Sequence, residues 1–140
     1  MYQLEKLIKN IITKRTNPLA LVILTHNTAA TIDVISEIIE RSGKKSVQTS
    51  TDDLLTYQNA IEFKFANETY IKETEEDTII LSDNTRILYA LKHQYEDIAY
   101  TYADNDKNLI VVTEDINSIA FMPDDSEFYQ IRKPKRVPLF

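Results

Sequence analysis

Two short apolar runs constrain the fold of this chain more than any other feature. Residues 19–25 read LALVILT, and residues 108–113 read NLIVVT. Each run has the length of a strand, and its apolar residues are continuous rather than alternating with polar ones. Continuous apolar runs are typical of strands buried on both faces of a parallel sheet. We therefore expect an α/β fold with a mostly parallel central sheet flanked by helices.

Helices are predicted on both sides of the first run. An i, i+3, i+4 spacing predicts an amphipathic helix near the N-terminus, ended by Asn17-Pro18. A second helix follows the run, with Asn27 or Thr28 as its N-cap and Gly43 just past its end, where a left-handed residue belongs. The inward stripes are expected to be Leu4, Leu7, Ile8, Ile11 and Ile12 in the first helix, and Ile32, Ile35, Ile38 and Ile39 in the second.

The apolar period changes from 3.6 to 2 after residue 60, which predicts strands. Residues 61–65 alternate apolar with charged side chains, and residues 69–74 suit a returning strand. Residues 78–82 and 85–91 flank Asp83-Asn84, which favours a tight hairpin turn. We therefore expect an antiparallel meander over residues 60–91 beside the parallel core. The stretch 92–103 fits either a helix or a strand, and residues 116–130 are expected to be loop.

The expected organisation is a single α/β domain over residues 1–130, followed by a basic tail over residues 131–140. The only glycine is Gly43, and cysteine is absent from the 140 residues. Glycine-rich phosphate loops are therefore excluded, as are disulfides and thiolate metal sites. The net charge of −6 disfavours a general affinity for nucleic acid. Since no apolar run approaches the roughly 18 residues of a membrane span, no membrane association is expected, and the expected compartment is cytoplasmic (the host cytoplasm if viral).

Glu114 and Asp115 directly follow the second apolar run. Adjacent carboxylates after a buried strand are typical of a Walker B segment, which holds Mg²⁺ and orients water. Segments 19–39, 79–91 and 108–123 resemble, in order and spacing, the middle of phage terminase large-subunit ATPase domains. The resemblance implies a hairpin at residues 79–91 and a Walker B strand at residues 109–115. The Walker A loop is missing and Glu-Asp inverts the usual order, so the resemblance implies a degenerate, regulatory relative.

Two further patterns point to catalysis. Asp53 followed by Glu62-Phe63-Lys64 resembles the PD-(D/E)xK nuclease motif, in which carboxylates hold Mg²⁺ and the lysine assists the attacking water. Strand alternation places Glu62 and Lys64 on one face, which is also the pattern of a solvated strand surface. His26 follows the first apolar run, at a ligand-facing position of α/β sheets. It can donate a proton or contact a phosphate there, or act as a hydrogen-bonded junction residue.

Surface composition favours binding over catalysis. Eight tyrosines and an acidic stretch around residues 73–77 suggest a tyrosine-rich acidic surface suited to a protein partner. Four basic residues near the C-terminus can contact a phosphate or an acidic partner, which makes nucleic acid a second partner class. We expect a non-enzymatic accessory protein of a viral or phage type, without a cofactor unless Mg²⁺ serves the catalytic alternatives. The expected contact residues are Tyr70, Tyr89, Tyr100, Tyr102, Arg132, Lys133, Lys135 and Arg136.

Overall fold

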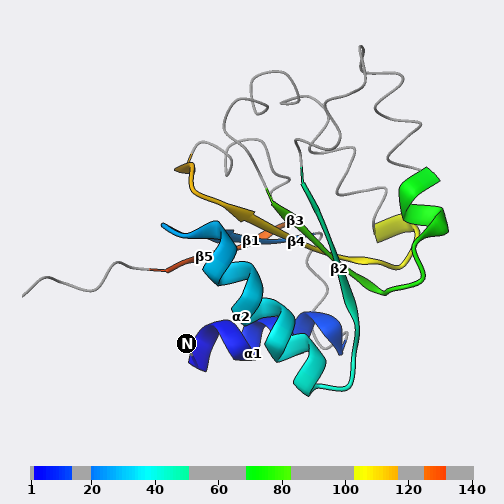
Figure 1. The fold of residues 1–140 in the computed structure, drawn as a ribbon, viewed down its shortest axis with the longest axis horizontal. Coiled ribbons are helices and arrows are strands. Elements are labelled where there is room, and N and C mark those ends of the chain that lie inside the picture. The colour runs from blue at the N-terminus through cyan, green and yellow to red at the C-terminus, as the bar shows by residue number, and fades with distance from the viewer. Residues whose placement is uncertain (1, 14–19, 51–68, 83–102, 117–124, 132–140) are drawn as a thin grey trace, which may run out of the picture.

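The computed structural model describes residues 2–13, 20–50, 69–82, 103–116 and 125–131 (Figure 1). Its elements, in chain order, are α1 (Tyr2–Ile12), β1 (Leu21–Leu24), α2 (Thr28–Arg41), β2 (Ser46–Ser50), β3 (Thr78–Ser82), β4 (Asn108–Thr113) and β5 (Glu127–Gln130). The five strands form one sheet in the order β2-β3-β4-β1-β5, and every neighbouring pair is parallel. The predicted α/β class with a parallel core is confirmed.

Both helices pack on the same face of the sheet (Figure 1). The predicted apolar stripes meet there, because α1 and α2 bury their leucine and isoleucine side chains against alternate residues of the strands. Each such side chain contributes about 1.5–3 kcal/mol relative to an exposed position. The core cluster comprises Leu4, Ile8, Ile11, Ile12, Leu21, Ile23, Ile32, Ile35, Ile38, Ile39, Ile80, Ile110 and Val112.

The opposite face of the sheet is equally buried. Val22, Leu81 and Val111 alternate with the core residues of their strands, and each is at most 1% exposed. All six residues of β4 are buried, and β4 has a paired strand on each side. Burial on both faces is the physical reason why the two apolar runs show no alternation.

The predicted antiparallel addition is wrong for the residues that the structure describes. Residues 78–82 form β3, which pairs in parallel with β2 along one edge and with β4 along the other over its whole length. No edge of β3 is left for a hairpin partner at residues 85–91, whose own structure lies outside the described residues. Residues 69–73 are helical rather than extended. Residues 61–65 also lie outside the described part.

Two strands were not predicted, and both form edges of the sheet. β2 reads SVQTS and β5 reads EFYQ. Edge strands have one free side, so they need fewer apolar residues than central strands. The expectation of loop over residues 116–130 is therefore wrong at residues 127–130.

Local capping follows the predictions at both ends of α2. Asn27 is the N-cap, and its side chain accepts a hydrogen bond of 3.0 Å from the backbone N–H of Ala30. Gly43 follows the C-cap and has a φ of +75°, the left-handed region that glycine adopts without strain. α1 ends at Ile12, before Asn17-Pro18, which lies outside the described residues. Within the described ranges, no helix has the length and apolar character needed to cross a membrane.

Candidate functional site

The strand order places the ends of β1 and β4 side by side. From β1 the chain continues through α2 to β2 at one edge, whereas from β4 it continues to β5 at the other edge. Parallel α/β sheets bind ligands outside the carboxyl ends of their strands at such a reversal. His26 follows β1, and Glu114 and Asp115 follow β4, so these candidates from distant parts of the sequence meet at one edge. The backbone N–H of Thr25 donates to the carbonyl of Thr113 at 2.9 Å, which extends the pairing to this point.

Buried threonine hydroxyls build the turn between β1 and α2. The hydroxyl oxygens of Thr25 and Thr31 lie 2.7 Å apart, and these residues are 4% and 5% exposed. The Thr31 hydroxyl also donates to the carbonyl of Asn27 at 2.8 Å, and the N–H of Asn27 donates to the Thr25 hydroxyl at 3.2 Å. The turn is therefore held by side-chain hydrogen bonds rather than by the glycines of a phosphate-binding loop.

The first turn of α2 contains one buried polar atom without a hydrogen-bond partner among the described residues. The hydroxyl of Thr28 is buried, and it has no hydrogen bond within the described part of the chain. The same turn has no acidic residue, and His26 before it is exposed. A polar or anionic group could be accepted here, since helix N-termini favour negative charge.

The acidic residues of this edge do not form a metal centre with other described residues. Within the described ranges, no group of three or more His, Asp or Glu side chains is placed to hold a metal ion. Glu114 is exposed, and the N–H of Asp115 donates to the Thr113 hydroxyl at 3.1 Å, which makes a turn at the strand end. The nuclease-type candidates Asp53, Glu62 and Lys64 lie outside the described residues.

One ionisable group is shifted by a clear partner. The hydrogen bond and the negative charge of Glu37 raise the pKa of Arg41. Both side chains are more than 60% exposed, one helical turn apart on α2. Exposed pairs of this kind contribute little to stability, and the pair marks no site.

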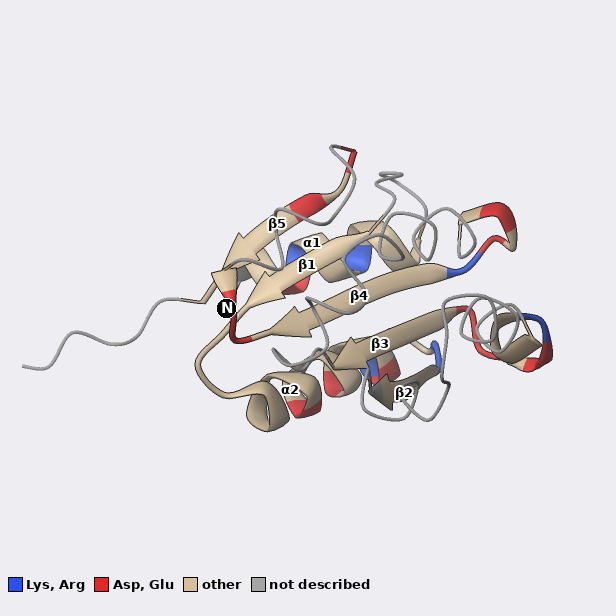
Figure 2. Cartoon of the chain, turned by 90° about the horizontal axis from the view of Figure 1, so that it is seen from above, with Lys and Arg blue, Asp and Glu red and all other residues tan. Residues whose placement is uncertain are grey.

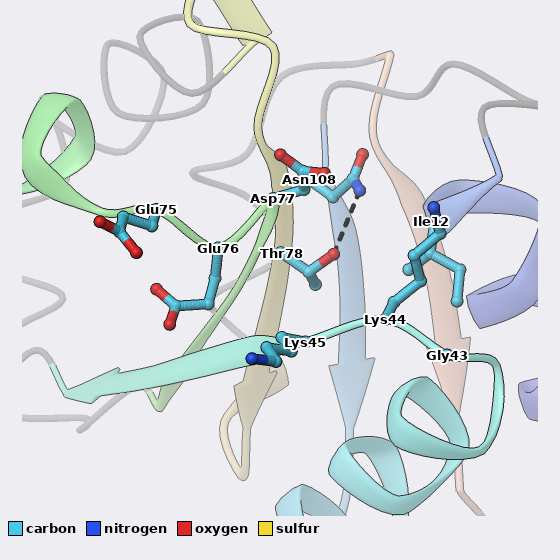
Figure 3. Close-up of a pocket in the computed structure, with 9 residues that line it drawn as sticks. All are labelled: Ile12, Gly43, Lys44, Lys45, Glu75, Glu76, Asp77, Thr78 and Asn108. Carbon is cyan, nitrogen blue, oxygen red and sulfur yellow. Dashed lines mark hydrogen bonds between the residues drawn. The ribbon is translucent and has the colours of Figure 1, made fainter.

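A pocket lies at the opposite, amino-terminal edge of the sheet. Its volume is about 360 Å³. Its walls come from the end of α1, the turn before β2, the segment before β3 and the first residue of β4. The lining residues are Ile12, Gly43, Lys44, Lys45, Glu75, Glu76, Asp77, Thr78 and Asn108 (Figure 3).

Opposite charges face each other across this amino-edge pocket. Figure 3 shows the segment of Lys44 and Lys45 along one side and the segment of Glu75 and Glu76 along the other. No ion pair within 4 Å joins the two sides in the part of the chain that the structure describes. A second depression of about 280 Å³ shares both lysines and Glu76, and it extends toward α2 and β2. The charges are therefore available to a molecule that enters from solvent.

Two acidic turns lie at the same edge of the sheet as the amino-edge pocket. One precedes β3 and the other precedes β4, and Figure 2 shows their carboxylate residues beyond the amino ends of these neighbouring strands. We call the exposed acidic residues of the two turns the amino-edge acidic surface. It consists of Glu73, Glu75, Asp77, Asp104 and Asp106.

Hydrogen bonds join the two turns to each other. The ammonium group of Lys107 donates to the carbonyls of Thr74 at 2.8 Å and Glu76 at 3.0 Å. The backbone N–H of Asn108 donates to the carbonyl of Asp77 at 2.7 Å, and its side-chain amide donates to the buried Thr78 hydroxyl at 3.1 Å. The acidic surface therefore rests on backbone that is fixed at both turns.

Most predicted partner-binding residues lie outside the described part of the chain. These are Tyr89, Tyr100, Tyr102, Arg132, Lys133, Lys135 and Arg136. Tyr70 is described, and it is half-buried on the helical turn of residues 69–73, next to the acidic surface.

The acidic stretch of residues 73–77 was predicted from the sequence, but the pocket that three of its residues line was not. Lys107 and Thr74 are 33 residues apart, and Lys44 and Lys45 are ordinary turn residues in sequence. No local pattern connects these positions, because parallel strand pairing alone brings the three turns to one edge.

No known protein-family model matches this sequence, and a search of curated proteins finds no match either. The fold defines the class of the protein as an α/β domain with a five-stranded, all-parallel sheet.

Proposed function

We propose that this chain is a non-enzymatic interaction protein that binds a basic segment of a protein partner at the amino-edge acidic surface. The observation that carries the proposal is the tie made by Lys107, which joins one acidic turn to the other. The tie joins the turn that carries Glu73, Glu75 and Asp77 to the turn that carries Asp104 and Asp106, and all five carboxylate residues are exposed. Clustered charges of one sign attract and orient an oppositely charged partner.

The fixed backbone of the two turns favours binding, because a surface that is already ordered loses less entropy when the partner arrives. The amino-edge pocket gives the partner a place to insert a side chain. Its lysine wall disfavours a uniformly basic segment. We therefore propose a partner segment whose basic residues contact the acidic surface and whose carboxylate or carbonyl groups face Lys44 and Lys45.

This proposal retains the partner class expected from the sequence and moves the main contact from tyrosines to carboxylates. Tyr70 is half-buried on the helical turn of residues 69–73, which also carries Glu73. The proposal includes an accessory role in a virus or phage. Only the composition of the chain supports that part of it.

The test measures binding of a fluorescent ten-residue peptide of alternating arginine and serine by anisotropy. The variant E73Q/E75Q/D77N removes three negative charges from the acidic surface. The matched control D33N/E37Q/E40Q removes three from the exposed side of α2. We expect at least tenfold weaker binding for the first variant, a change within twofold for the control, and a strong decrease with added salt.

Equal weakening by both variants would show that only net charge matters, and it would overturn the proposed surface. Absence of peptide binding at low salt would also overturn it. Circular dichroism and the unfolding midpoint of each variant establish that both remain folded.

A second candidate function lies at the carboxyl edge. We propose it as the alternative of a degenerate, P-loop-like regulatory domain that binds a nucleotide with Mg²⁺. Its support is the meeting of His26, Glu114 and Asp115 beside the buried Thr28 hydroxyl, together with the terminase resemblance.

A thermal-shift panel with Mg²⁺ and with Mg²⁺–ATP tests this alternative. Ligand at 100 times its dissociation constant adds about 2.7 kcal/mol of stability, and the variant E114Q/D115N should lose that gain. A panel without any shift overturns this alternative.

The nuclease alternative rests on Asp53, Glu62 and Lys64, and it stays a prediction. Its test is Mg²⁺-dependent cleavage of linear DNA, which Glu62→Gln should abolish. An intact substrate with the unaltered protein would contradict it.

A further inference from the structure

The amino-edge pocket has one positively charged wall and one negatively charged wall. Lys44 and Lys45 lie before β2 on one side (Figure 3). The acids of the other side lie before β3, and they are Glu75, Glu76 and Asp77. Among the described residues, no ion pair within 4 Å joins the lysines to these acids. Each wall can therefore form charge-assisted hydrogen bonds with a molecule that enters the pocket.

Glu76 is the best-placed acceptor of the acidic wall. It lines this pocket and also the neighbouring depression of about 280 Å³. The residue is half-buried, whereas both of its acidic neighbours are exposed. A carboxylate that is partly shielded from water attracts a cation more strongly, because the local dielectric constant is lower. The ammonium group of Lys107 holds the backbone carbonyl of Glu76 at 3.0 Å, so the acid projects from a fixed segment.

Two buried polar residues complete the lining. The side-chain amide of Asn108 donates to the hydroxyl of Thr78 at 3.1 Å, and these residues are 5% and 1% exposed. A hydroxyl that accepts one hydrogen bond can still donate its own hydrogen. Thr78 therefore offers a neutral donor to a ligand oxygen beside the two charged walls.

The size of the pocket limits what can enter it. Its volume of about 360 Å³ lies near the lower end of the range of roughly 300–1000 Å³ that is typical of small-ligand sites. A helix with its side chains is about 10–12 Å across, which is too wide for this space. One or two residues of an extended chain fit it better. A ligand that contacts both walls must therefore carry a positive and a negative group within that short length.

We propose that the amino-edge pocket binds the carboxyl terminus of a partner chain that ends in arginine or lysine. Such a residue carries a cationic side chain and the terminal carboxylate together. The carboxylate would face Lys44 and Lys45, and the cationic side chain would face Glu76. This assignment rests on the function proposed above, and it specifies which part of the basic partner segment enters the pocket.

The surroundings of the pocket favour this terminus over other doubly charged segments. A chain that begins with an acidic residue also carries both charges, but the amino-edge acidic surface would repel that residue. Basic residues that precede a C-terminal arginine are attracted by the same surface. An internal segment has no charged backbone group, so it would need a second charged side chain to contact both walls.

The test compares three peptides that carry a fluorophore at the amino end. The first is SRSRSRSRSR with a free carboxylate, the second is the same peptide as an amide, and the third is RSRSRSRSRS with a free carboxylate. We expect the first to bind at least fivefold more tightly than either of the others by anisotropy. Amidation makes the peptide more positive, so attraction to the acidic surface alone predicts the reverse order for the first two.

Variants assign the two preferences to the two walls. K44Q/K45Q should abolish the preference for a free carboxylate over the amide, because it removes the positive wall. Glu76→Gln should abolish the preference for a terminal arginine over a terminal serine. The control K6Q/K9Q removes two charges from exposed lysines of α1, and it should retain both preferences. Circular dichroism of each variant establishes that it remains folded.

Several outcomes would overturn the assignment of the pocket. If the amide binds as tightly as the free acid while the E73Q/E75Q/D77N variant still weakens both, the acidic surface stands and the terminus proposal fails. A carboxylate preference that survives K44Q/K45Q has the same meaning. Free arginine should compete at least tenfold more weakly than the first peptide, and equal competition would assign the pocket to a small molecule instead. Absence of binding by all three peptides would overturn the proposed function and the terminus proposal together.

Discussion

The ammonium nitrogen of Lys107 lies 2.8 Å from the carbonyl oxygen of Thr74, across 33 residues of sequence. The same nitrogen reaches the carbonyl of Glu76 at 3.0 Å. This side chain is half-buried. Its ammonium group links the turn before β4 to the turn before β3 by these two hydrogen bonds. A lysine in this position stabilises an acidic surface that would otherwise repel itself.

Removal of the Lys107 ammonium group should destabilise the two turns that carry the acidic surface. Lys107→Met keeps the length of the side chain and removes the donor, and we expect a loss of about 1–2 kcal/mol of unfolding free energy, because hydrogen bonds from charged groups are the stronger ones. Urea unfolding measures the loss. The control Lys72→Met alters an exposed lysine of the neighbouring helical turn and should change stability by less than about 0.5 kcal/mol. Equal losses would contradict a specific role for Lys107.

The central part of the fold could be predicted from sequence because burial on both faces leaves a continuous apolar run. LVIL and LIVV have this property, and they became the adjacent strands β1 and β4. The caps of α2 were also predictable, because Asn27 and Gly43 act through their own local chemistry. These features depend only on residues close in sequence.

The edge strands and the antiparallel meander show where local patterns fail. SVQTS in β2 carries one apolar side chain, and it is a strand because β3 supplies its hydrogen bonds. TIILS was correctly expected to be extended, but its two neighbours come from residues 46–50 and 108–112 rather than from the adjoining segment. Pairing over long sequence distances decides such cases, and no single segment contains that information.

The same distinction between local patterns and long-range pairing applies to the candidate sites. The carboxyl-edge residues His26, Glu114 and Asp115 were identifiable because each ends an apolar run. Their proximity to one another follows only from the pairing of β1 with β4. The amino-edge pocket was missed because residues from four separate segments of the chain line it.

The N-cap of α2 offers a second prediction. Asn27→Ala removes the acceptor for the Ala30 N–H and should cost about 1 kcal/mol. Asn27→Asp keeps the acceptor and adds a negative charge at a first turn that has no acidic residue. It should match or exceed the stability of the unaltered chain at neutral pH by a few tenths of a kcal/mol, about the size of a helix-dipole effect. Thermal unfolding of the two variants compares them, and equal destabilisation by both would rule out capping as the role of Asn27.

The threonine pair of the β1–α2 turn should behave as a coupled unit. Thr25→Val and Thr31→Val each remove the hydrogen bond between the two buried hydroxyls, and each should cost about 0.5–1.5 kcal/mol, the usual net contribution of a hydrogen bond. The double variant should cost less than the sum by at least about 0.5 kcal/mol, since the hydroxyls that bond to each other at 2.7 Å are then both absent. A double-mutant cycle from denaturant unfolding gives the coupling energy. Strict additivity would show that the two hydroxyls act independently.

The contrast between two isoleucines tests where the core lies. Ile80 of β3 is fully buried and belongs to the cluster beneath α1 and α2. Ile80→Ala should therefore cost about 2–5 kcal/mol, because it removes apolar contacts and leaves a cavity. Ile116 is 64% exposed, and Ile116→Ala should change stability by less than about 0.5 kcal/mol. Urea unfolding of both variants makes the comparison, and the m-value should stay constant if both remain two-state. A large loss at Ile116 would mean that a second copy or another part of the chain covers it in solution. A small loss at Ile80 would mean that β3 is not held between two packed layers.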